Sequence, residues 1–537
     1  MIRNILLFAL LSFTLSALAQ LPETYDLRDV NGVNYVTSVK SQQGGTCWTH
    51  GTMASMEGNM LMTGTWAANG EDGEPALAEY HLDWWNGYNS YYNQDLIPPF
   101  NNGQGLDVHM GGDYRVVTAY LSRLDGAVRE IDGQSYDTPP YFDHPFYHYY
   151  YPMDVEWYTA GANLENIDTI KQKVIDYGVM AICMCWDGNF FDGINHYQPP
   201  SSNLEPNHSV SIVGWDDNHI TQAPEPGAWV IKNSWGAGWG DDGYFWISYY
   251  DKQACQNPEM GAVSFIDVDI IDWDTAYYYD YHGWRDTLIN TNYAFNAFTA
   301  AEDEAIVAVS FFTAESDVSF TAKIFDDFDG VTLANELSSI SGSFQHSGLH
   351  TVMFSDTARI VKGDDFYVYL NLDKGGFAYD RTSEVPVLLG ASSRVIVPST
   401  ANAGESYYSL WDDWVDFYDY DDPSGFQNTG NLCIKAIANH DPITEVQQSL
   451  NNNLEFIISP NPFTYNLNLK FNVEKKSIIS LQVFSVDGRL VFDTGENFAD
   501  AGAFQQSIIL ENQKQGLYFV NLKIDGVSVI TKKVIKN

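Results

Sequence analysis

The chain has 537 residues, of which 45% are hydrophobic and 15% aromatic, so it is long enough for several packed domains and too apolar to be generally disordered. Its 70 acidic and 27 basic residues give a net charge of -43, which repels phosphate backbones and excludes nucleic acid as a partner. Residues 454–537 differ, with nine Lys or Arg and eight Asp or Glu, and we expect them to form a separate module.

The first nineteen residues have the pattern of an export signal. A single cation, Arg3, precedes an apolar run over residues 5–15, and small residues follow at 16–19, where a signal peptidase would cleave. We therefore expect residues 1–19 to be a signal peptide and the rest of the chain to be secreted or held at the cell surface. No later segment offers the roughly 20 apolar residues of a transmembrane helix.

Residues 20–263 mix helical and strand patterns. Apolar residues recur at helical spacing over 47–62 and over 168–177, whereas 179–185 and 209–214 are typical of short strands. This segment is predicted to be an α+β domain.

The rest of the chain is typical of β structure. Residues 265–438 contain short runs of Phe, Tyr, Val and Ile between Asp, Gly and Ser turns, which predicts an all-β sandwich. Residues 439–453 are polar and predict a linker. Residues 454–537 alternate strand patterns with Asp-Gly turns at 487–488 and 525–526, which favour hairpins. We therefore expect an α+β domain followed by two all-β sandwich domains.

A cysteine stands in a position that suits a nucleophile. Residues 39–48 read VKSQQGGTCW, so Cys47 follows a glycine turn and opens the first predicted helix. Amide N–H groups at a helix N-terminus and a neighbouring imidazolium both stabilise a thiolate. The thiol pKa is therefore expected below its free value of about 8.5, which would make the sulfur reactive at neutral pH.

A histidine and an asparagine supply the groups that such a thiol needs. Residues 207–215, NHSVSIVGW, place His208 at the head of a predicted strand, and residues 229–244, WVIKNSWGAGWGDDGY, contain Asn233 followed by two tryptophans. An amide oxygen can fix the tautomer of an imidazole base while an indole shields that bond from water.

Together these segments resemble the papain family of cysteine peptidases, in which the catalytic residues follow the order Cys, His, Asn. Residues 21–28, LPETYDLR, are also similar to a mature papain-type N-terminus, so the resemblance covers residues 21 to about 260. It implies that Cys47 is the nucleophile, His208 the acid and base, Asn233 the residue that orients the histidine, and Trp235 the shield.

The resemblance also implies an oxyanion hole made by a glutamine side chain and the Cys47 N–H group. We favour Gln42 for this role, although Gln43 competes because the loop before Cys47 is one residue shorter than usual. Two further departures are the missing cysteine before the nucleophile and His50, which stands where the family often has phenylalanine.

Other family elements predict the substrate cleft. Gly111 and Gly112 would present backbone to the substrate. A side chain near Tyr114 would form, together with Ser209, the wall of a specificity pocket on the acyl side of the scissile bond. Cys47 and His208 are 161 residues apart, more than the roughly 130 to 150 typical of the family. The candidate insertions, which could narrow the cleft, are the aromatic stretches 84–92 and 141–158.

The remaining cysteines, histidines and acids suggest no cofactor. Cys183 and Cys185 are predicted to be buried thiols, and a bridge between Cys255 and Cys433 is left open. The histidines lack zinc-ligand spacing, so we expect no catalytic metal. The acidic runs at 412–416 and 419–422 offer oxygen ligands for calcium, with a solvated loop as the favoured reading.

Two accessory segments have resemblances of their own. Residues 265–438 resemble the lectin-like β domain that follows some bacterial papain-type peptidases, which makes a glycan a candidate partner. Residues 454–537 resemble the type A sorting domain of type IX secretion, which implies that secretion machinery as a partner and passage across the outer membrane. An ordinary adhesion module is the alternative for this tail.

The sequence thus predicts a secreted cysteine endopeptidase that hydrolyses peptide bonds through a thioester acyl-enzyme. The main alternative is a surface adhesin or carbohydrate-binding protein with a catalytically silent peptidase-like domain. A third reading keeps the nucleophile but makes the enzyme an exopeptidase or transpeptidase.

Overall fold

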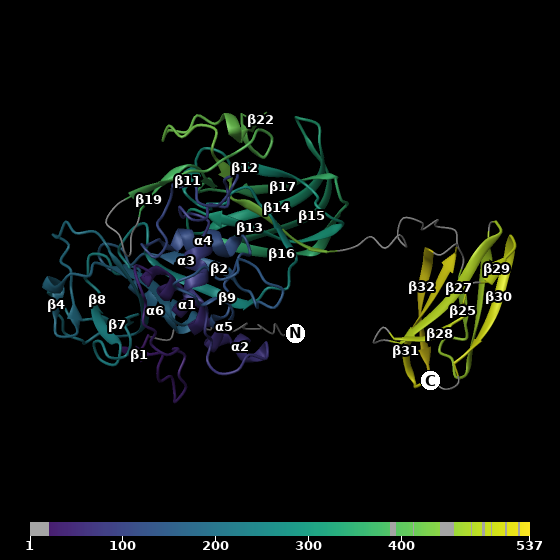
Figure 1. Cartoon of the computed structure of the whole chain (residues 1–537), viewed down its shortest axis with the longest axis horizontal. Coiled ribbons are helices and arrows are strands. Elements are labelled where there is room, and N and C mark those ends of the chain that lie inside the picture. The colour runs from purple at the N-terminus through teal and green to yellow at the C-terminus, as the bar shows by residue number, and fades with distance from the viewer. Residues whose placement is uncertain are drawn as a thin grey trace, which may run out of the picture. The chain divides into compact units, whose positions relative to one another are not determined.

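The computed structural model describes residues 21–386, 394–411, 413–440, 456–473, 475–485, 489–495, 497–510, 513–524 and 527–537. The chain forms two compact units, Met1–His440 and Asp441–Asn537 (Figure 1). The predicted signal peptide and most of the predicted linker lie outside the described residues. Among the described residues, no helix is both long and apolar enough to cross a membrane.

The first half of the larger unit is α+β, as predicted. Its helices are α1 (Cys47–Thr63), α2 (Thr65–Ala68), α3 (Glu79–Trp85), α4 (Tyr114–Ser122), α5 (Glu130–Gly133) and α6 (Ile167–Tyr177), with a 3-10 turn at Gly188–Phe190. Its strands are β1 (Thr24–Asp26), β2 (Tyr150–Tyr158), β3 (Met180–Met184), β4 (Phe191–Asp192), β5 (Asn195–His196), β6 (His208–Asp216), β7 (Ala228–Lys232), β8 (Tyr244–Ser248) and β9 (Ala262–Ile270). The predicted helices at 47–62 and 168–177 and strands at 179–185 and 209–214 are confirmed within two residues.

Helix α1 is the central helix of this half. Almost every side chain from Cys47 to Met60 is buried, and the helix ends at Gly64, which takes the left-handed conformation that favours glycine. Gly51 lets the helix approach β6 closely, because a Cβ there would meet Ser209 Oγ at 2.4 Å. The beginning of α1 and the head of β6 are therefore held together.

One 13-stranded sheet joins the two halves of the larger unit, in the order β10-β24-β13-β16-β2-β9-β3-β6-β7-β8-β5-β4, with β1 beside β6. The junction is the antiparallel pairing of β2 with β16 (Ser347–Ile360). Across it, the ring Nδ1 of His350 lies 2.7 Å from Asp154 Oδ1. Much of the stretch 141–158 is thus a strand of the main sheet rather than a loop over the cleft.

The second half of the larger unit is a β-sandwich, in which strands of the 13-stranded sheet pack against further strands. The strands are β10 (Thr275–Tyr277), β11 (Asp286–Leu288), β12 (Tyr293–Thr299), β13 (Glu304–Thr313), β14 (Val318–Phe328), β15 (Leu333–Phe344), β16, β17 (Asp365–Leu372), β18 (Phe377–Asp380), β19 (Ser383–Pro386), β20 (Arg394–Val397), β21 (Ser406–Leu410), β22 (Asp413–Asp416), β23 (Asn431–Leu432) and β24 (Ile434–His440), with a 3-10 turn at Phe417–Asp419. The six-stranded sheet β15-β14-β17-β12-β21-β22 shares one apolar core with β13, β16 and β24.

The smaller unit is a separate β-sandwich. Its strands are β25 (Ile457–Ser459), β26 (Asn466–Val473), β27 (Ser477–Ser485), β28 (Leu490–Asp493), β29 (Asn497–Ala499), β30 (Gly502–Ile509), β31 (Gly516–Ile524) and β32 (Val527–Lys536). A three-stranded and a five-stranded sheet enclose its own core. The predicted Asp-Gly turns lie outside the described residues, although the strands on either side of each are antiparallel partners.

Candidate active site

His208 and Asn233 meet where two neighbouring strands end. His208 opens β6 and Asn233 directly follows β7, its antiparallel neighbour. The imidazole Nε2 lies 2.8 Å from Asn233 Oδ1, and both side chains are 3% exposed. The indole of Trp235 stacks on the imidazole with ring centroids 4.5 Å apart and planes 19° apart. The ring of His208 therefore contacts both Asn233 and Trp235, and the orienting and shielding roles of these two residues stay predictions.

Cys47 lies in the same cleft as His208. The cleft has a volume of about 400 Å³ and is lined by Gln42, Gly44, Gly45, Cys47, Met110, Trp186, Asn207, His208 and Trp235. The structure thus gathers the cysteine, histidine and favoured glutamine from distant parts of the sequence. Cys47 itself is the first residue of α1 and is 2% exposed.

Burial opposes charge on both reactive groups. It raises the pKa of the Cys47 thiol to about 12, against hydrogen bonds from the backbone of Ser209 and Trp48 that lower it. It also lowers the pKa of His208 to about 4, despite the bond to Asn233. The sequence predicted a thiol pKa below the free value, whereas the depth of this site favours a thiol beside a neutral imidazole.

Gln42, rather than Gln43, lies at the cleft. Its side-chain Oε1 accepts a hydrogen bond of 2.6 Å from Ser234 Oγ, and its Nε2 donates to Gly44 O at 2.9 Å. Gln43 is exposed and its backbone N–H donates to Tyr80 Oη. The Gln42 amide is therefore fixed between Ser234 and the glycine turn, and its role in binding an oxyanion stays a prediction.

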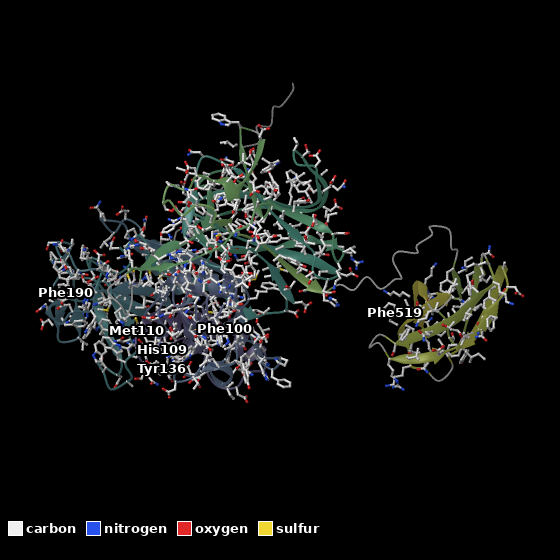
Figure 2. All side chains as sticks on the ribbon, turned by 45° about the horizontal axis from the view of Figure 1, so that its top comes forward. Phe100, His109, Met110, Tyr136, Phe190 and Phe519 are labelled. Carbon is white, nitrogen blue, oxygen red and sulfur yellow. The ribbon has the colours of Figure 1, made fainter. Side chains whose placement is uncertain are left out.

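The two glycines predicted to face the substrate lie beside the turn that precedes Cys47. A Cβ on Gly45 would meet Gly111 N at 3.2 Å, and a Cβ on Gly112 would meet the Trp48 indole at 2.7 Å. Only a residue without a side chain fits against that ring. The neighbouring Met110, labelled in Figure 2, is half-exposed. It is one of the residues that line the cleft.

Tyr114 and Ser209, the positions at which the acyl-side pocket was expected, contact each other. Both are buried, and their hydroxyls hydrogen-bond to each other. Neither is among the residues that line the Cys47 cleft. The aromatic stretches 84–92 and 141–158 do not line it either, since Trp85 and Phe142 pack on each other in the core.

Trp186 is a cleft residue that the sequence patterns missed. Its ring meets Trp235 edge-on with centroids 4.5 Å apart. The side chain of Asn207, next to His208, holds it in place by accepting from Trp186 N at 2.6 Å and donating to Trp186 O at 3.1 Å. Because this contact joins two loops about twenty residues apart, local periodicity could not reveal it.

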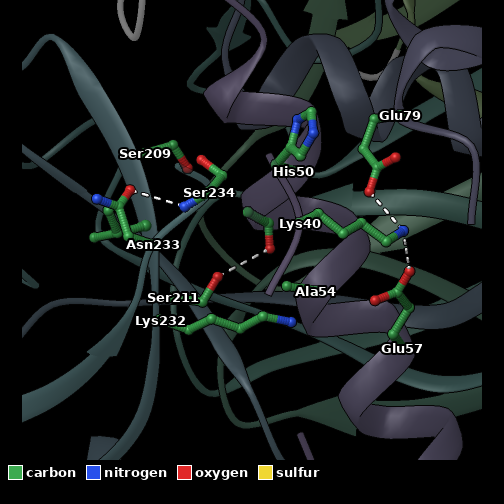
Figure 3. A pocket seen from close by; sticks show the side chains of 12 residues that line it. Lys40, His50, Ala54, Glu57, Glu79, Ser209, Ser211, Lys232, Asn233 and Ser234 are labelled. Carbon is green, nitrogen blue, oxygen red and sulfur yellow. Dashed lines mark hydrogen bonds and ion pairs between the residues drawn. The ribbon is translucent and has the colours of Figure 1, made fainter. Parts of the chain in front are cut away.

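A buried charge network lies behind the site (Figure 3). Lys40 Nζ donates to Glu57 Oε1 at 2.8 Å and to Glu79 Oε1 at 2.7 Å. His50 and Asn233 line the same small cavity, of about 20 Å³. This network ties the segment before Cys47 to α1 and α3, and the sequence analysis did not identify it.

The described residues contain one cluster with the composition of a metal site. The ligand atoms of Asp95, His282 and Asp380 lie within 4.8 Å of one another, and all three residues are buried. Both carboxylates already accept hydrogen bonds from protein groups. The acidic runs 412–416 and 419–422 form no such group in the described residues, which exclude residue 412.

All five cysteines lie in the described residues and are buried thiols. The prediction for Cys183 and Cys185 is confirmed. Cys255 and Cys433 form no disulfide, which settles the alternative that the sequence left open.

Sequence models of three families match the chain. The model of the papain family cysteine proteases matches residues 149–264, which include His208 and Asn233 but not Cys47. A lectin-like domain matches residues 276–438, and a secretion system C-terminal sorting domain matches residues 458–537.

Curated relatives are similar over less than half of the chain. A viral cathepsin of Cydia pomonella granulosis virus is 28% identical over 244 residues, which are 44% of this chain and 60% of the relative. Zingipain-2 of Zingiber officinale is 26% identical over 227 residues, which are 42% of this chain and 86% of that protein. The chain spans about three fifths of the length of the viral cathepsins it matches.

A solved structure shares the fold of the larger unit. The cysteine protease and lectin-like domains of Cwp84, a surface layer associated protein of Clostridium difficile, align with a TM-score of 0.62 at 22% identity. The alignment covers 79% of this chain and 90% of that one. The papain-like and lectin-like architecture is therefore confirmed as a fold. The chain carries sequence of a papain-family cysteine protease, of a lectin-like domain and of a secretion system C-terminal sorting domain.

Proposed function

We propose that the chain is a secreted cysteine endopeptidase with Cys47 as nucleophile, His208 as acid and base, and Asn233 as the residue that orients His208. The observation that carries the proposal is the 2.8 Å contact between His208 Nε2 and Asn233 Oδ1 beneath the Trp235 indole. This contact leaves the other ring nitrogen for the thiol, which opens α1 in the same cleft. Such a Cys, His, Asn set performs nucleophilic acyl transfer.

The buried thiol and imidazole transfer a proton as the reaction begins. Burial makes a lone thiolate or a lone imidazolium unfavourable here, whereas two opposite charges formed together stabilise each other. His208 therefore takes the Cys47 proton as the sulfur attacks the scissile carbonyl. It then gives that proton to the leaving amine, and a thioester between the acyl group and Cys47 remains. Water, deprotonated by His208, hydrolyses this thioester and restores the thiol.

The Gln42 amide and the Cys47 N–H group would bind the carbonyl oxygen as it gains charge. Ser234 fixes one end of the Gln42 amide, while the Nε2 that would bind substrate donates to Gly44 O. A substrate oxyanion would replace this neutral acceptor with a charged one, which forms a stronger hydrogen bond. One such donor is worth roughly 10² to 10³ in rate.

The accessory segments direct the enzyme to the outside of the cell. The match of residues 458–537 to a secretion sorting domain supports secretion or surface attachment, and we propose type IX secretion after removal of residues 1–19. The lectin-like match supports a glycan as a second partner. Trp411, which is 90% exposed, is the aromatic side chain best placed to stack on a sugar ring. A glycan array without binding above background would end this second proposal.

Hydrolysis of a fluorogenic peptide library tests the peptidase proposal. The chain should cleave internal peptide bonds, and Cys47→Ala should abolish cleavage. Cys185→Ala, which removes a different buried thiol, should retain it. Product analysis separates an endopeptidase from an exopeptidase or a transpeptidase. If none of the three proteins cleaves any peptide and an epoxide inhibitor of cysteine peptidases does not label them, the adhesin alternative would be favoured.

A further inference from the structure

Tyr114 spans the space in which the acyl-side pocket was expected. It opens α4, directly after Gly111, Gly112 and Asp113, and is 0% exposed. Its hydroxyl donates to Ile182 O on β3 at 2.8 Å and also hydrogen-bonds Ser209 Oγ on β6. The Tyr114 side chain therefore reaches from the segment that contains Gly111 and Gly112 across to β6, the strand that carries His208.

The phenol stands beside the nucleophile. The backbone of Ser209 hydrogen-bonds the Cys47 thiol, so the partner of the Tyr114 hydroxyl is also a neighbour of the sulfur. Gly51, one turn along α1 from Cys47, packs on the same pair. A Cβ there would meet Ser209 Oγ at 2.4 Å and Tyr114 Oη at 3.6 Å. The space between α1, α4 and the head of β6 is thus already filled.

We propose that Tyr114 fills the acyl-side pocket, so that the enzyme takes peptides with Gly, Ala or Ser at the position whose side chain points there. This inference rests on the proposed peptidase function and adds its substrate class. Moving the ring aside for a larger side chain would break both hydrogen bonds and leave buried polar groups unpaired, which is costly. The side chains that remain free to contact a substrate are on the rim of the cleft, where Met110 is 50% exposed.

A positional peptide library on the full chain tests the proposal, with every acyl-side position scanned against Gly, Ala, Ser, Leu and Phe. Each methylene group that a closed pocket cannot accommodate lowers kcat/KM by roughly 10- to 200-fold. At one acyl-side position we therefore expect Gly, Ala or Ser to exceed Leu and Phe at least tenfold. Tyr114→Ala should reverse that order at the same position, whereas Tyr114→Phe, which keeps the ring, should retain it.

The wild-type profile decides the question even where Tyr114→Ala fails to fold. A wild-type profile in which no acyl-side position prefers Gly, Ala or Ser over Leu and Phe at least tenfold would overturn the proposal while leaving the peptidase function intact. An unchanged profile in a folded Tyr114→Ala protein would also overturn it. Absence of cleavage, together with absence of epoxide labelling at Cys47, would count against the peptidase function itself and would remove the basis of this inference.

Discussion

Replacement of Asn233 by alanine tests how the histidine is oriented. The change removes the acceptor 2.8 Å from His208 Nε2 in a site where both residues are 3% exposed. His208 becomes positive during the reaction, and a hydrogen bond to a charged group contributes about 1.5–3 kcal/mol. We therefore expect kcat/KM to fall roughly 10- to 150-fold, mainly through kcat, because the bond strengthens as the imidazolium forms.

The assay is steady-state hydrolysis of the best library peptide, with thermal unfolding measured in parallel to show that the variant is folded. Asn218→Ala is the matched control, since this exposed asparagine lies beyond the opposite end of β6 from His208. It should keep kcat/KM within twofold of the wild type. A folded Asn233→Ala protein that also stays within twofold would refute the claim that Asn233 orients the base.

Two further predictions concern stability. Gly51→Ala should lower the free energy of unfolding by about 1–3 kcal/mol, because its Cβ would meet Ser209 Oγ at 2.4 Å. Urea unfolding checks this, with Gly188→Ala as the control because a Cβ there meets nothing within 4 Å. Equal free energies of unfolding for the two variants would contradict the prediction. Burial lowers the pKa of His81 and of His208 to about 4, below the unfolded value of about 6.5. Each therefore contributes stability above pH 6.5 that is lost as pH falls toward 4, about 3 kcal/mol per group. Urea midpoints at pH 8 and pH 4.5 check this loss, and equal midpoints would contradict the prediction.

The elements around the site could be predicted because their signals are local. The helix at α1 follows from apolar residues at helical spacing after a glycine turn, and β6 follows from the β-branched run after His208. The order of Cys47, His208 and Asn233 was likewise visible in three short motifs. The roles of these residues stay predictions, although the structure brings Cys47, His208 and Asn233 into one region.

The features that could not be predicted depend on contacts between distant segments. The pairing of β2 with β16 joins residues about 190 positions apart, and the sequence of neither strand indicates which strand it pairs with. The pKa of Cys47 is raised because the thiol is buried, and this burial outweighs the lowering expected from its position at the start of a helix. A side chain near Tyr114 was expected to form a pocket wall with Ser209, but the sequence did not reveal that the Tyr114 hydroxyl itself hydrogen-bonds to both β3 and β6.

The central claim is that Cys47 carries the acyl group during peptide hydrolysis. The most direct measurement is mass spectrometry of the enzyme quenched with acid during turnover of a peptide ester. The account predicts a mass increase equal to the acyl group, located by peptide mapping at Cys47, and none in Cys47→Ala. Turnover by Cys47→Ala, or an acyl group on another residue, would contradict it.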